Sequence, residues 1–361
     1  MWITSSLPTA HTPTDVALGN FDGVHLGHQA VIRPILPALI ANEPREYLSP
    51  DEQDTALLKG FSDRCPLLLE QCDFQSAQAP AHSWGTDPMP TAVTFYPHPR
   101  EFFSGEVRPW LTPLNEKAAF MRQLGVCQLV LLPFKQELAN LSPETFVEAV
   151  LLDRLQARHI SVGADFRFGH KRMGDVTLLE RLAMQRGATV TVVQLAEEGD
   201  DRISSSRIRQ ALCAGDVLQA RQLLGRPYQL TGRVVKGQQL GRQIGFPTAN
   251  LQLPSDKFLP RTGVYSVRAY GVPGHPTQQA VAGVMNIGVR PTVDGNTQTI
   301  EVHLLNWQGD LYDCTLTVTL QSFLRPEQRF DSLDQLKAQI QADCDAAQTA
   351  LEVGNYSGST A

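Results

Sequence analysis

The sequence predicts a two-domain α/β protein, with a parallel sheet flanked by helices in its N-terminal part and a small antiparallel β-barrel in its C-terminal part. The chain has 361 residues, of which 42% are hydrophobic, and this suffices for two ordinary cores. Up to residue 225, short apolar runs alternate with helix-like segments. Beyond it, short β-rich runs are separated by Gly, Pro and Asn. The first pattern is typical of a parallel sheet and the second of a barrel.

The N-terminal part is expected to form a Rossmann-like parallel sheet. We expect its strands at residues 16–21, 91–96, 127–134, 159–165 and 188–195. We expect helices between them at residues 25–40, 115–125, 142–155 and 176–187. The third helix has good start signals, because Ser142 suits the N-cap and Pro143 the first helical position. Sheets of this kind bind ligands at the carboxyl ends of their strands, so a site is expected there.

The C-terminal part is expected to be a barrel closed by a helix. Its strands are predicted at residues 228–237, 263–271, 279–289, 299–307 and 314–323. The closing helix is predicted to begin at Ser332. The change from alternating strands and helices to short β-rich runs places a boundary near residues 225–229. This predicts domains at 1–225 and 226–346. A disordered tail is expected at 347–361.

An acidic segment at residues 41–89 interrupts the N-terminal pattern. It holds nine acids and three bases, and this excess equals the net charge of −6 of the whole chain. It also contains five prolines. We expect an inserted, mostly mobile loop, because closure entropy grows only slowly with loop length. The two interpretations left open are a spacer without function and a segment that folds over a nearby cleft and modulates ligand entry.

Composition excludes several classes of protein. The negative charge argues against a nucleic-acid binder. No run approaches 18 apolar residues, so no membrane span is expected. The N-terminus lacks the basic start and apolar core of a signal peptide. Six cysteines without a CxxC pair fit reduced thiols, which indicates a cytoplasmic protein. The sequence does not determine the oligomeric state, and a homo-oligomer is one of the possibilities.

The stretch ALGNFDGVHLGHQAVI at residues 17–32 predicts a phosphate site. A strand that runs into a Gly-rich turn and then a helix directs backbone N–H groups at a ligand. His25 and His28 are three residues apart, so they share a face of the first helical turn. Their imidazoles could steady a displaced pyrophosphate, which is nucleotidyl transfer by positioning and charge stabilisation. The alternative is a helix start with two surface histidines.

A second basic group lies at residues 201–212, DRISSSRIRQAL. Three serines precede Arg207 and Arg209 at the start of an expected helix. Serine caps, helix N–H groups and an arginine can together hold phosphate. The alternative is a capped helix with solvated arginines.

Many motifs occur in one order along the chain outside the acidic segment and the two ends. The N-terminal ones are GNFDGVHLGHQ, TFYPHPREFF, LTPLNEKAAFMRQLGV, LSPETFVEAVL, VGADFRFGHKRMGD and ISSSRIRQAL. The C-terminal ones are LLGRPYQLTGRVVKGQQLGRQIGFPTANL, GVYSV, GVMNIGVRPT, IEVHLLNWQGDLY and FLRPE. In these motifs the chain resembles the bacterial bifunctional riboflavin kinase/FMN adenylyltransferase (FAD synthetase) family. It departs from the family at Ser206, where Thr is usual, and at Asn306, where an acid is common.

The resemblance implies two ATP-dependent reactions: phosphorylation of riboflavin to FMN by the C-terminal domain, and adenylylation of FMN to FAD and pyrophosphate by the N-terminal, HxGH-type nucleotidyltransferase domain. His25 and His28 would be its catalytic residues. The implied ATP contacts are Gly19, Asn20, Phe21, Asp22, Gly23, His25, His28, Ser205, Ser206 and Arg209. The implied flavin contacts are Phe95, His98, Pro99, Asp165, Phe166 and Phe168. Aromatic side chains suit a flat isoalloxazine ring, although Phe166 and Phe168 also suit a core.

The kinase half is expected to use Mg²⁺ with ATP. Thr248 and Asn250 point the same way if extended, and their oxygens are hard ligands suited to Mg²⁺; an Asn turn is the alternative. Glu301 lies in the middle of a strand, between apolar residues, so its carboxylate either faces solvent or has a catalytic role. The family places its catalytic base there. The implied nucleotide-loop residues are Gly237, Gly241, Arg242, Gly245 and Pro247, and the implied flavin contacts are Glu301 and Arg325.

Three other functions remain to be weighed. One is an enzyme with a single active half, and another is a non-catalytic flavin- or nucleotide-binding regulator. The third is an HxGH transferase acting on nicotinate mononucleotide or pantetheine phosphate. The combination of Thr248, Asn250 and Glu301 argues against a pure binder, and the β-rich second domain argues against the third. The expected partners are therefore riboflavin, FMN, FAD and ATP, with neither nucleic acid nor membrane.

Overall fold

The computed structural model describes residues 1–37, 87–194, 197–198, 201–237, 240–276, 279–292 and 295–356. Most of the acidic segment at 41–89 lies outside these residues, so its predicted mobility is not addressed. The chain divides into two compact units, which part between Ser204 and Ser205. No helix in the described ranges is both long enough and apolar enough to cross a membrane.

The first unit contains the expected parallel sheet. Its six strands run in the order β1-β4-β3-β2-β5-β6, and every neighbouring pair is parallel. The strands are β1 (Trp2–Thr4), β2 (Thr14–Leu18), β3 (Met89–Tyr96), β4 (Gln128–Pro133), β5 (Ala157–Gly163) and β6 (Thr189–Val193). Five of them confirm the prediction. The edge strand β1 was missed because three residues are too few to show an alternation.

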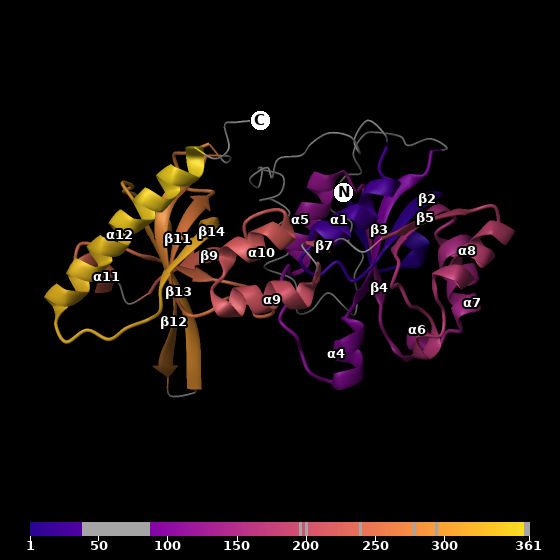
Figure 1. The fold of residues 1–361 in the computed structure, drawn as a ribbon, viewed down its shortest axis with the longest axis horizontal. Helices are drawn as coiled ribbons and strands as arrows, with labels where there is room; N and C mark the ends of the chain where they lie inside the picture. The colour runs from indigo at the N-terminus through magenta and orange to yellow at the C-terminus, as the bar shows by residue number, and fades with distance from the viewer. Residues whose placement is uncertain are drawn as a thin grey trace. The chain divides into compact units, whose positions relative to one another are not determined.

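Helices connect these strands (Figure 1). They are α1 (Leu26–Ile32), α4 (Pro99–Ser104), α5 (Leu114–Leu124), α6 (Gln136–Ala139), α7 (Pro143–Thr145) and α8 (Val176–Gln185). The first is shorter than predicted, because a 3-10 turn at Arg33–Ile35 replaces it where Pro34 cannot donate a backbone N–H. Ser142 caps α7 as predicted, its side chain accepting from the N–H of Thr145 at 3.1 Å. A small pair of strands, β7 (Glu197–Glu198) and β8 (Asp201–Arg202), ends the unit.

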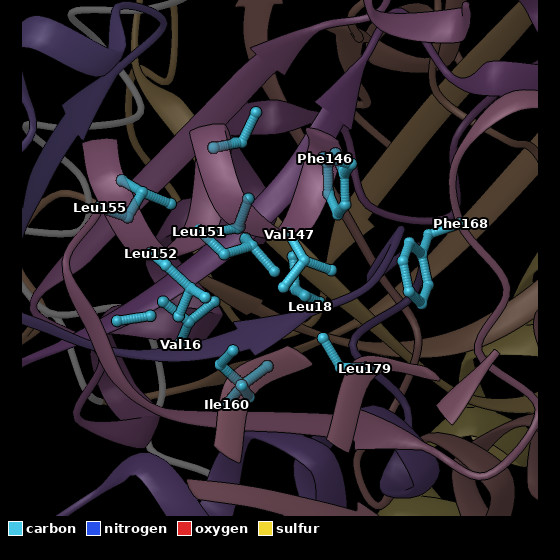
Figure 2. Close-up of a cluster of buried hydrophobic side chains, with 14 of the residues drawn as sticks. Val16, Leu18, Phe146, Val147, Leu151, Leu152, Leu155, Ile160, Phe168 and Leu179 are labelled. Carbon is cyan, nitrogen blue, oxygen red and sulfur yellow. The ribbon is translucent and has the colours of Figure 1, made fainter. Parts of the chain in front are cut away.

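The core of the first unit lies between the sheet and a π-helix at Phe146–Arg154, which continues α7. Figure 2 shows the side chains of Val147 and Leu151 from this helix gathered with Val16 and Leu18 of β2 and Ile160 of β5. All five are almost fully buried. A π-helix is rare and is typical of functional or strained regions. The core includes residues of β2 and β5, and β2 leads into residues 19–28, which we call the HxGH loop.

The second unit contains the expected antiparallel barrel, which is closed in the order β10-β13-β12-β11-β14-β9. Its strands are β9 (Gln229–Val235), β10 (Ala249–Gln252), β11 (Gly263–Tyr270), β12 (Val281–Thr292), β13 (Gly295–Leu304) and β14 (Thr315–Arg325). The sequence analysis listed all of them but β10. Asn250 lies in this strand, so the alternative of an Asn turn is wrong. β12 and β13 form a long hairpin (Figure 1).

The described residues of this unit form four helices: α9 (Ser205–Ala214), α10 (Val217–Leu224), α11 (Leu240–Gln243) and α12 (Leu333–Tyr356). The turn between α9 and α10 packs against the barrel, because Gly215 lies against the ring of Phe323 and Leu212 O accepts from the N–H of Arg261 at 2.9 Å. The sequence analysis had grouped these helices with the N-terminal domain. The predicted functional boundary near residue 225 stays a prediction.

The last helix, α12, covers the outside of the barrel over β11 and β12 (Figure 1). Cys344 and Ala347 of α12 pack with Val264 of β11 and Val284 of β12. The helix continues to Tyr356, so the described part of the stretch predicted as a disordered tail is helical. The reason is that Ala347 and Leu351, four residues apart, are both buried on its inner face. Residues 357–361 lie outside the described part of the chain.

Candidate functional site

The HxGH loop joins β2 to α1 through a backbone held in unusual conformations. Phe21 and Val24 have positive φ angles of 49° and 41°, and Gly23 has a φ of 91°. The carboxylate of Asp22 accepts from the N–H of Leu111 at 2.8 Å, and Gly23 donates its N–H to Oγ1 of Thr112 at 2.9 Å. Such strained positions persist only where surrounding contacts over-determine them, and they cluster at functional sites.

The two histidines of the loop lie together at the start of α1. His25 is the N-cap, and its Nδ1 accepts from the N–H of His28 at 3.3 Å. The two rings are stacked with centroids 3.6 Å apart, and Phe21 meets the ring of His28 edge-on at 5.4 Å. His25 is 6% exposed. The alternative of two surface histidines is therefore wrong for His25, and the predicted shared face is present.

A buried lysine next to this loop was missed by the sequence analysis. Lys117 of α5 donates from Nζ to the backbone O of Asn20 at 3.0 Å, an oxygen that also accepts from Oγ1 of Thr94 at 3.1 Å. Lys117 is 4% exposed, and Nζ lies 4.3 Å from the centroid of the Trp110 ring. No local pattern marks it, because a lysine in the amphipathic stretch NEKAAFM is typical of the solvated face of a helix. It places a positive charge beside the predicted phosphate loop.

His98 lies at the same end of the sheet, after β3. It caps α4, with Nδ1 accepting from the N–H of Arg100 at 3.0 Å, and its ring meets Trp110 edge-on at 5.5 Å. Burial lowers the pKa of His98 to about 4, and the nearby Lys117 charge also lowers it, against an opposing effect of Asp22. His98 is therefore neutral at neutral pH. It can accept or donate a hydrogen bond without adding charge.

The residues predicted to line the flavin differ in how accessible they are. Phe95 is partly buried, with its ring edge-on to Phe134 at 5.6 Å. Phe166 is partly buried and stacks on Phe168 at 5.6 Å. Phe168 itself is only 5% exposed and belongs to the core. Asp165 is exposed and pairs with Arg202 at 2.6 Å.

Ser205, Ser206 and Arg209 lie in the first turns of α9, in the second unit. Arg209 donates from Nη1 to the backbone O of Ser205 at 3.5 Å, and its guanidinium lies 5.4 Å from the centroid of the Phe258 ring. The alternative of simply solvated arginines does not describe Arg209, because it is partly buried against an aromatic ring. Its predicted contact with ATP stays a prediction.

In the barrel, strand register brings the kinase candidates into one row. Asn250 of β10 stands opposite Glu301 of β13, and Glu301 stands opposite Asn286 of β12. Asn286 pairs in turn with Val264 of β11, and Val264 with Arg325 of β14. Directly opposed residues share a face of the sheet. Val264 packs under α12, so this barrel row lies on the outer face.

Thr248 and Asn250 meet the glycines of the preceding loop. A Cβ at Gly237 would lie 2.3 Å from Nδ2 of Asn250, and a Cβ at Gly241 would lie 3.3 Å from Oγ1 of Thr248. Only glycine therefore lets this loop approach the two polar side chains so closely. Gly245, with a φ of 94°, turns the chain after α11, Arg242 is exposed, and Pro247 O lies 2.8 Å from Nδ1 of His303.

The oxygens of Thr248 and Asn250 fit a hard cation that keeps water and phosphate ligands. Within the described ranges, no three His, Cys, Asp or Glu side chains gather as a metal site. Thr248 and Asn250 themselves offer neutral oxygens to a cation, and ligand phosphates would add charged ones.

Arg325, predicted to contact flavin, forms an ion pair with an acid of α12. Its Nη2 and Nε donate to the carboxylate of Asp343 at 2.8 and 2.9 Å, and Asp343 is 6% exposed. Gln339 donates to the same carboxylate at 3.0 Å. The ring of Phe330 lies 5.8 Å from the Arg325 guanidinium. This arrangement makes Arg325 an anchor for the FLRPE segment.

The register also adds Asn286, which the sequence analysis quoted only within a family motif. Its partner Glu301 is fifteen positions away in a different strand, so no local pattern links them. Asn306, the departure noted above, has a φ of 53°. Asparagine tolerates this left-handed conformation better than most residues, which accounts for it in this turn.

Family models match both parts of the chain. The model described as riboflavin kinase matches residues 224–351. The model described as FAD synthetase matches in two pieces, residues 7–78 and 74–207, which meet inside the acidic segment.

Curated relatives extend over nearly the whole chain. A bifunctional riboflavin kinase/FMN adenylyltransferase of Pseudomonas fluorescens is 39% identical over 95% of this chain and 94% of its own length. The protein of the same description from Escherichia coli (strain K12) is 36% identical over 91% of this chain and 90% of its own. A solved structure described as a macrolide-efflux protein from Streptococcus pneumoniae superposes with a TM-score of 0.73 at 27% identity, over 96% of this chain and 98% of that one.

Proposed function

This chain belongs to the bifunctional riboflavin kinase/FMN adenylyltransferase family, and we propose that the barrel row performs the kinase reaction and the HxGH loop the adenylyl transfer. The protein phosphorylates riboflavin with ATP to give FMN, and then adenylylates FMN with a second ATP to give FAD and pyrophosphate. The observation that carries the assignment of the kinase site is the register of Asn250 opposite Glu301.

In the kinase reaction, Glu301 accepts the proton of the terminal ribityl hydroxyl as that oxygen attacks the γ-phosphate. Asn250 lies beside it on the same face. Thr248 and Asn250 would hold Mg²⁺, which neutralises charge on the ATP phosphates when bound. Gly237 and Gly241 let the loop backbone approach the nucleotide, and Arg242, Gly245 and Pro247 complete the loop. Arg325 supports the flavin side through its anchored segment.

In adenylyl transfer, FMN phosphate attacks the α-phosphate of ATP and pyrophosphate leaves. This step needs no protein nucleophile, so catalysis is positioning and charge stabilisation. His25 and His28 hold the leaving phosphates. We assign the turn of Gly19, Asn20, Phe21, Asp22 and Gly23 to the nucleotide side of the site. The N–H groups of Gly19 and Gly23 are donated to Val93 O and to Oγ1 of Thr112, and these bonds hold the turn in place. Ser205, Ser206 and Arg209 are expected to add to the phosphate contacts, and the charge of Lys117 favours anions near Asn20.

On the flavin side of this reaction, Phe95 and Phe166 offer aromatic faces, while Phe168 supports Phe166 from the core. Neutral His98, followed by Pro99, provides a hydrogen-bonding group at the end of β3. Asp165 is held by Arg202 at the end of β5. We place these reactions in the cytoplasm, as the cysteine usage indicates.

A regulator without catalysis would need neither a base nor metal ligands on the same face. The opposition of Asn250 and Glu301, beside Thr248, therefore favours an enzyme. The description of the Streptococcus pneumoniae structure as an efflux protein does not change this view, because the fold match covers the same two parts that carry the kinase and synthetase matches.

The test is a time course with riboflavin, ATP and Mg²⁺, followed by chromatography. We expect FMN to rise and then give way to FAD, with one pyrophosphate released per FAD. FMN that accumulates without FAD would contradict the assignment of the HxGH loop. No conversion of riboflavin by folded protein would contradict the assignment of the barrel row. Replacing Mg²⁺ with a chelator is expected to stop both steps.

A further inference from the structure

The backbone carbonyl of Asn20 in the HxGH loop accepts two hydrogen bonds from buried side chains. One comes from Nζ of Lys117 at 3.0 Å and the other from Oγ1 of Thr94 at 3.1 Å. Lys117 is 4% exposed and Thr94 is 1% exposed. Because a peptide group is planar, two donors on its oxygen fix the orientation of the whole peptide that joins Asn20 to Phe21.

That peptide is held in an orientation that its residues disfavour. Phe21 has a φ of 49°, in the left-handed region, which is unusual for a bulky side chain. Rotating the peptide by about half a turn would return the φ of Phe21 to the extended region that most residues adopt. A strained orientation persists only where the surroundings hold it. The hydrogen bonds from Lys117 and Thr94 to Asn20 oppose this rotation directly.

The orientation of this peptide bears on the two histidines of the loop. Phe21 is fully buried, and its ring meets the ring of His28 edge-on at 5.4 Å. The His28 ring is in turn stacked on the ring of His25 at 3.6 Å. A Cβ at Gly19 would lie 3.1 Å from the Phe21 ring, so this ring already packs tightly against the end of β2. A rotation of the peptide would therefore move the Phe21 ring and change the packing of His28.

Lys117 belongs to a segment, residues 110–117, that binds the loop at other points as well. The N–H of Leu111 donates to the carboxylate of Asp22 at 2.8 Å. Oγ1 of Thr112 accepts from the N–H of Gly23 at 2.9 Å. The lysine therefore reaches the loop from a segment that the fold already fixes against it.

We propose that Lys117 is a positioning residue of the adenylyltransferase, which acts through the Asn20 carbonyl to hold His25 and His28 in the arrangement that grips the departing pyrophosphate. This inference rests on the adenylyl transfer proposed above for the HxGH loop. A hydrogen bond from a charged donor is about twice as strong as one from a neutral donor, so Lys117 supplies the larger share of the restraint and Thr94 the smaller. Burial of an ammonium group is costly, and an apolar side chain could fill the same space. The donor is what such a side chain would lack.

The test measures adenylylation of supplied FMN. Lys117→Met keeps most of the side-chain length and removes the donor, so it should lower kcat about 10–100-fold. Thr94→Val keeps the branched shape that suits a strand and should lower kcat about 2–10-fold. The KM values for ATP and FMN should stay near those of the wild type, because the lost positioning acts on the transition state. Riboflavin phosphorylation by the same proteins should be unchanged.

The matched control is Thr91→Val. Thr91 is a fully buried threonine near the start of the same strand, β3. Its Oγ1 donates to the backbone O of Met89 at 2.8 Å and accepts from Nε2 of Gln128 at 3.1 Å, so it makes no bond to the HxGH loop. This variant loses buried hydrogen bonds and should lower the unfolding temperature while kcat stays at the wild-type value. It separates general destabilisation from the loss of positioning.

A wild-type kcat in Lys117→Met would overturn the inference, and so would equal losses of kcat in Thr94→Val and Thr91→Val. A higher KM for ATP at unchanged kcat would also overturn it, because that result assigns Lys117 to ground-state binding. If the Lys117→Met protein does not fold, the comparison of the two threonine variants decides alone. Folded wild-type protein that does not convert FMN to FAD would instead overturn the adenylyltransferase function on which the inference rests.

Discussion

The HxGH loop and the barrel row hold their polar side chains by different means. In the loop, strained backbone at Phe21 and Val24 and hydrogen bonds to Asp22 and Gly23 fix a few consecutive residues. In the barrel row, residues far apart in sequence meet because regular strands pair in register. A loop site is therefore visible as a local motif, whereas a row across strands is visible only once the register is known. A substitution in one site should therefore leave the reaction of the other site unchanged.

The largest expected effect separates the two sites through Glu301. Glu301→Ala should lower kcat for riboflavin phosphorylation about 10²–10⁴-fold, because a positioned general base contributes on that scale. Conversion of supplied FMN to FAD by the same variant should stay at the wild-type rate. The measurement is the initial rate of each half-reaction by chromatography. A variant that keeps the wild-type kinase rate would show that Glu301 is not the base.

The matching experiment on the loop uses His28. His28→Ala should lower the rate of FAD formation from FMN about 10²–10³-fold, because removing one preformed hydrogen-bond donor to developing charge costs that much. Riboflavin phosphorylation should be unchanged. His275→Ala, which changes a histidine of the second unit outside both sites, is the control. Equal loss in the two histidine variants would argue against a role for His28 at the phosphates.

The next effect tests whether α12 is part of the kinase unit. Asp343→Asn leaves Arg325 without its buried counter-charge, which typically costs about 3–5 kcal/mol. We expect faster amide hydrogen exchange in α12 and β14 and a higher KM for riboflavin. Asp345→Asn, which changes an exposed acid on the same helix, should shift stability by no more than about 0.5 kcal/mol. Equal protection in both variants would show that the ion pair does not hold α12.

The smallest expected effect is on the pH dependence of the stability of the first unit. Burial lowers the pKa of His98 from its ordinary 6.5 to about 4, so between these values the unfolded chain binds a proton that the folded chain resists. The contribution of neutral His98 to stability is complete above pH 6.5 and is lost as the pH falls toward 4. His98→Asn keeps an N-cap acceptor and should flatten this part of the pH profile. Thermal unfolding at several pH values measures it, and parallel profiles would contradict the account.

The sequence predicted the fold class and most strands because hydrophobic periodicity and turn residues act locally. It missed β10 because Pro247 and Asn250 favour turns, whereas pairing with both β9 and β13 overrides that preference. It expected a disordered tail from residue 347, whereas α12 continues to Tyr356, because the burial of Ala347 and Leu351 depends on the barrel beneath them.

The candidate site residues show the same difference between local motifs and tertiary contacts. His25, His28, Thr248 and Asn250 were predicted from motifs whose residues lie within a few positions of one another. Lys117 and Asn286 were not predicted, because only the tertiary structure brings them to these sites. Lys117 donates to the backbone O of Asn20, and Asn286 stands opposite Glu301 in the neighbouring strand. Phe168 lies in the core, and the flavin contact that a motif suggested for it stays a prediction.

The central claim is that one chain carries two separable active sites. The most direct measurement mixes the Glu301→Ala and His28→Ala proteins with riboflavin, ATP and Mg²⁺ and follows FAD. Each variant alone should form almost no FAD from riboflavin, one for lack of FMN and the other for lack of adenylylation. The mixture should form FAD, because FMN made by one protein is adenylylated by the other. FAD from either variant alone at the wild-type rate, or none from the mixture, would contradict the account.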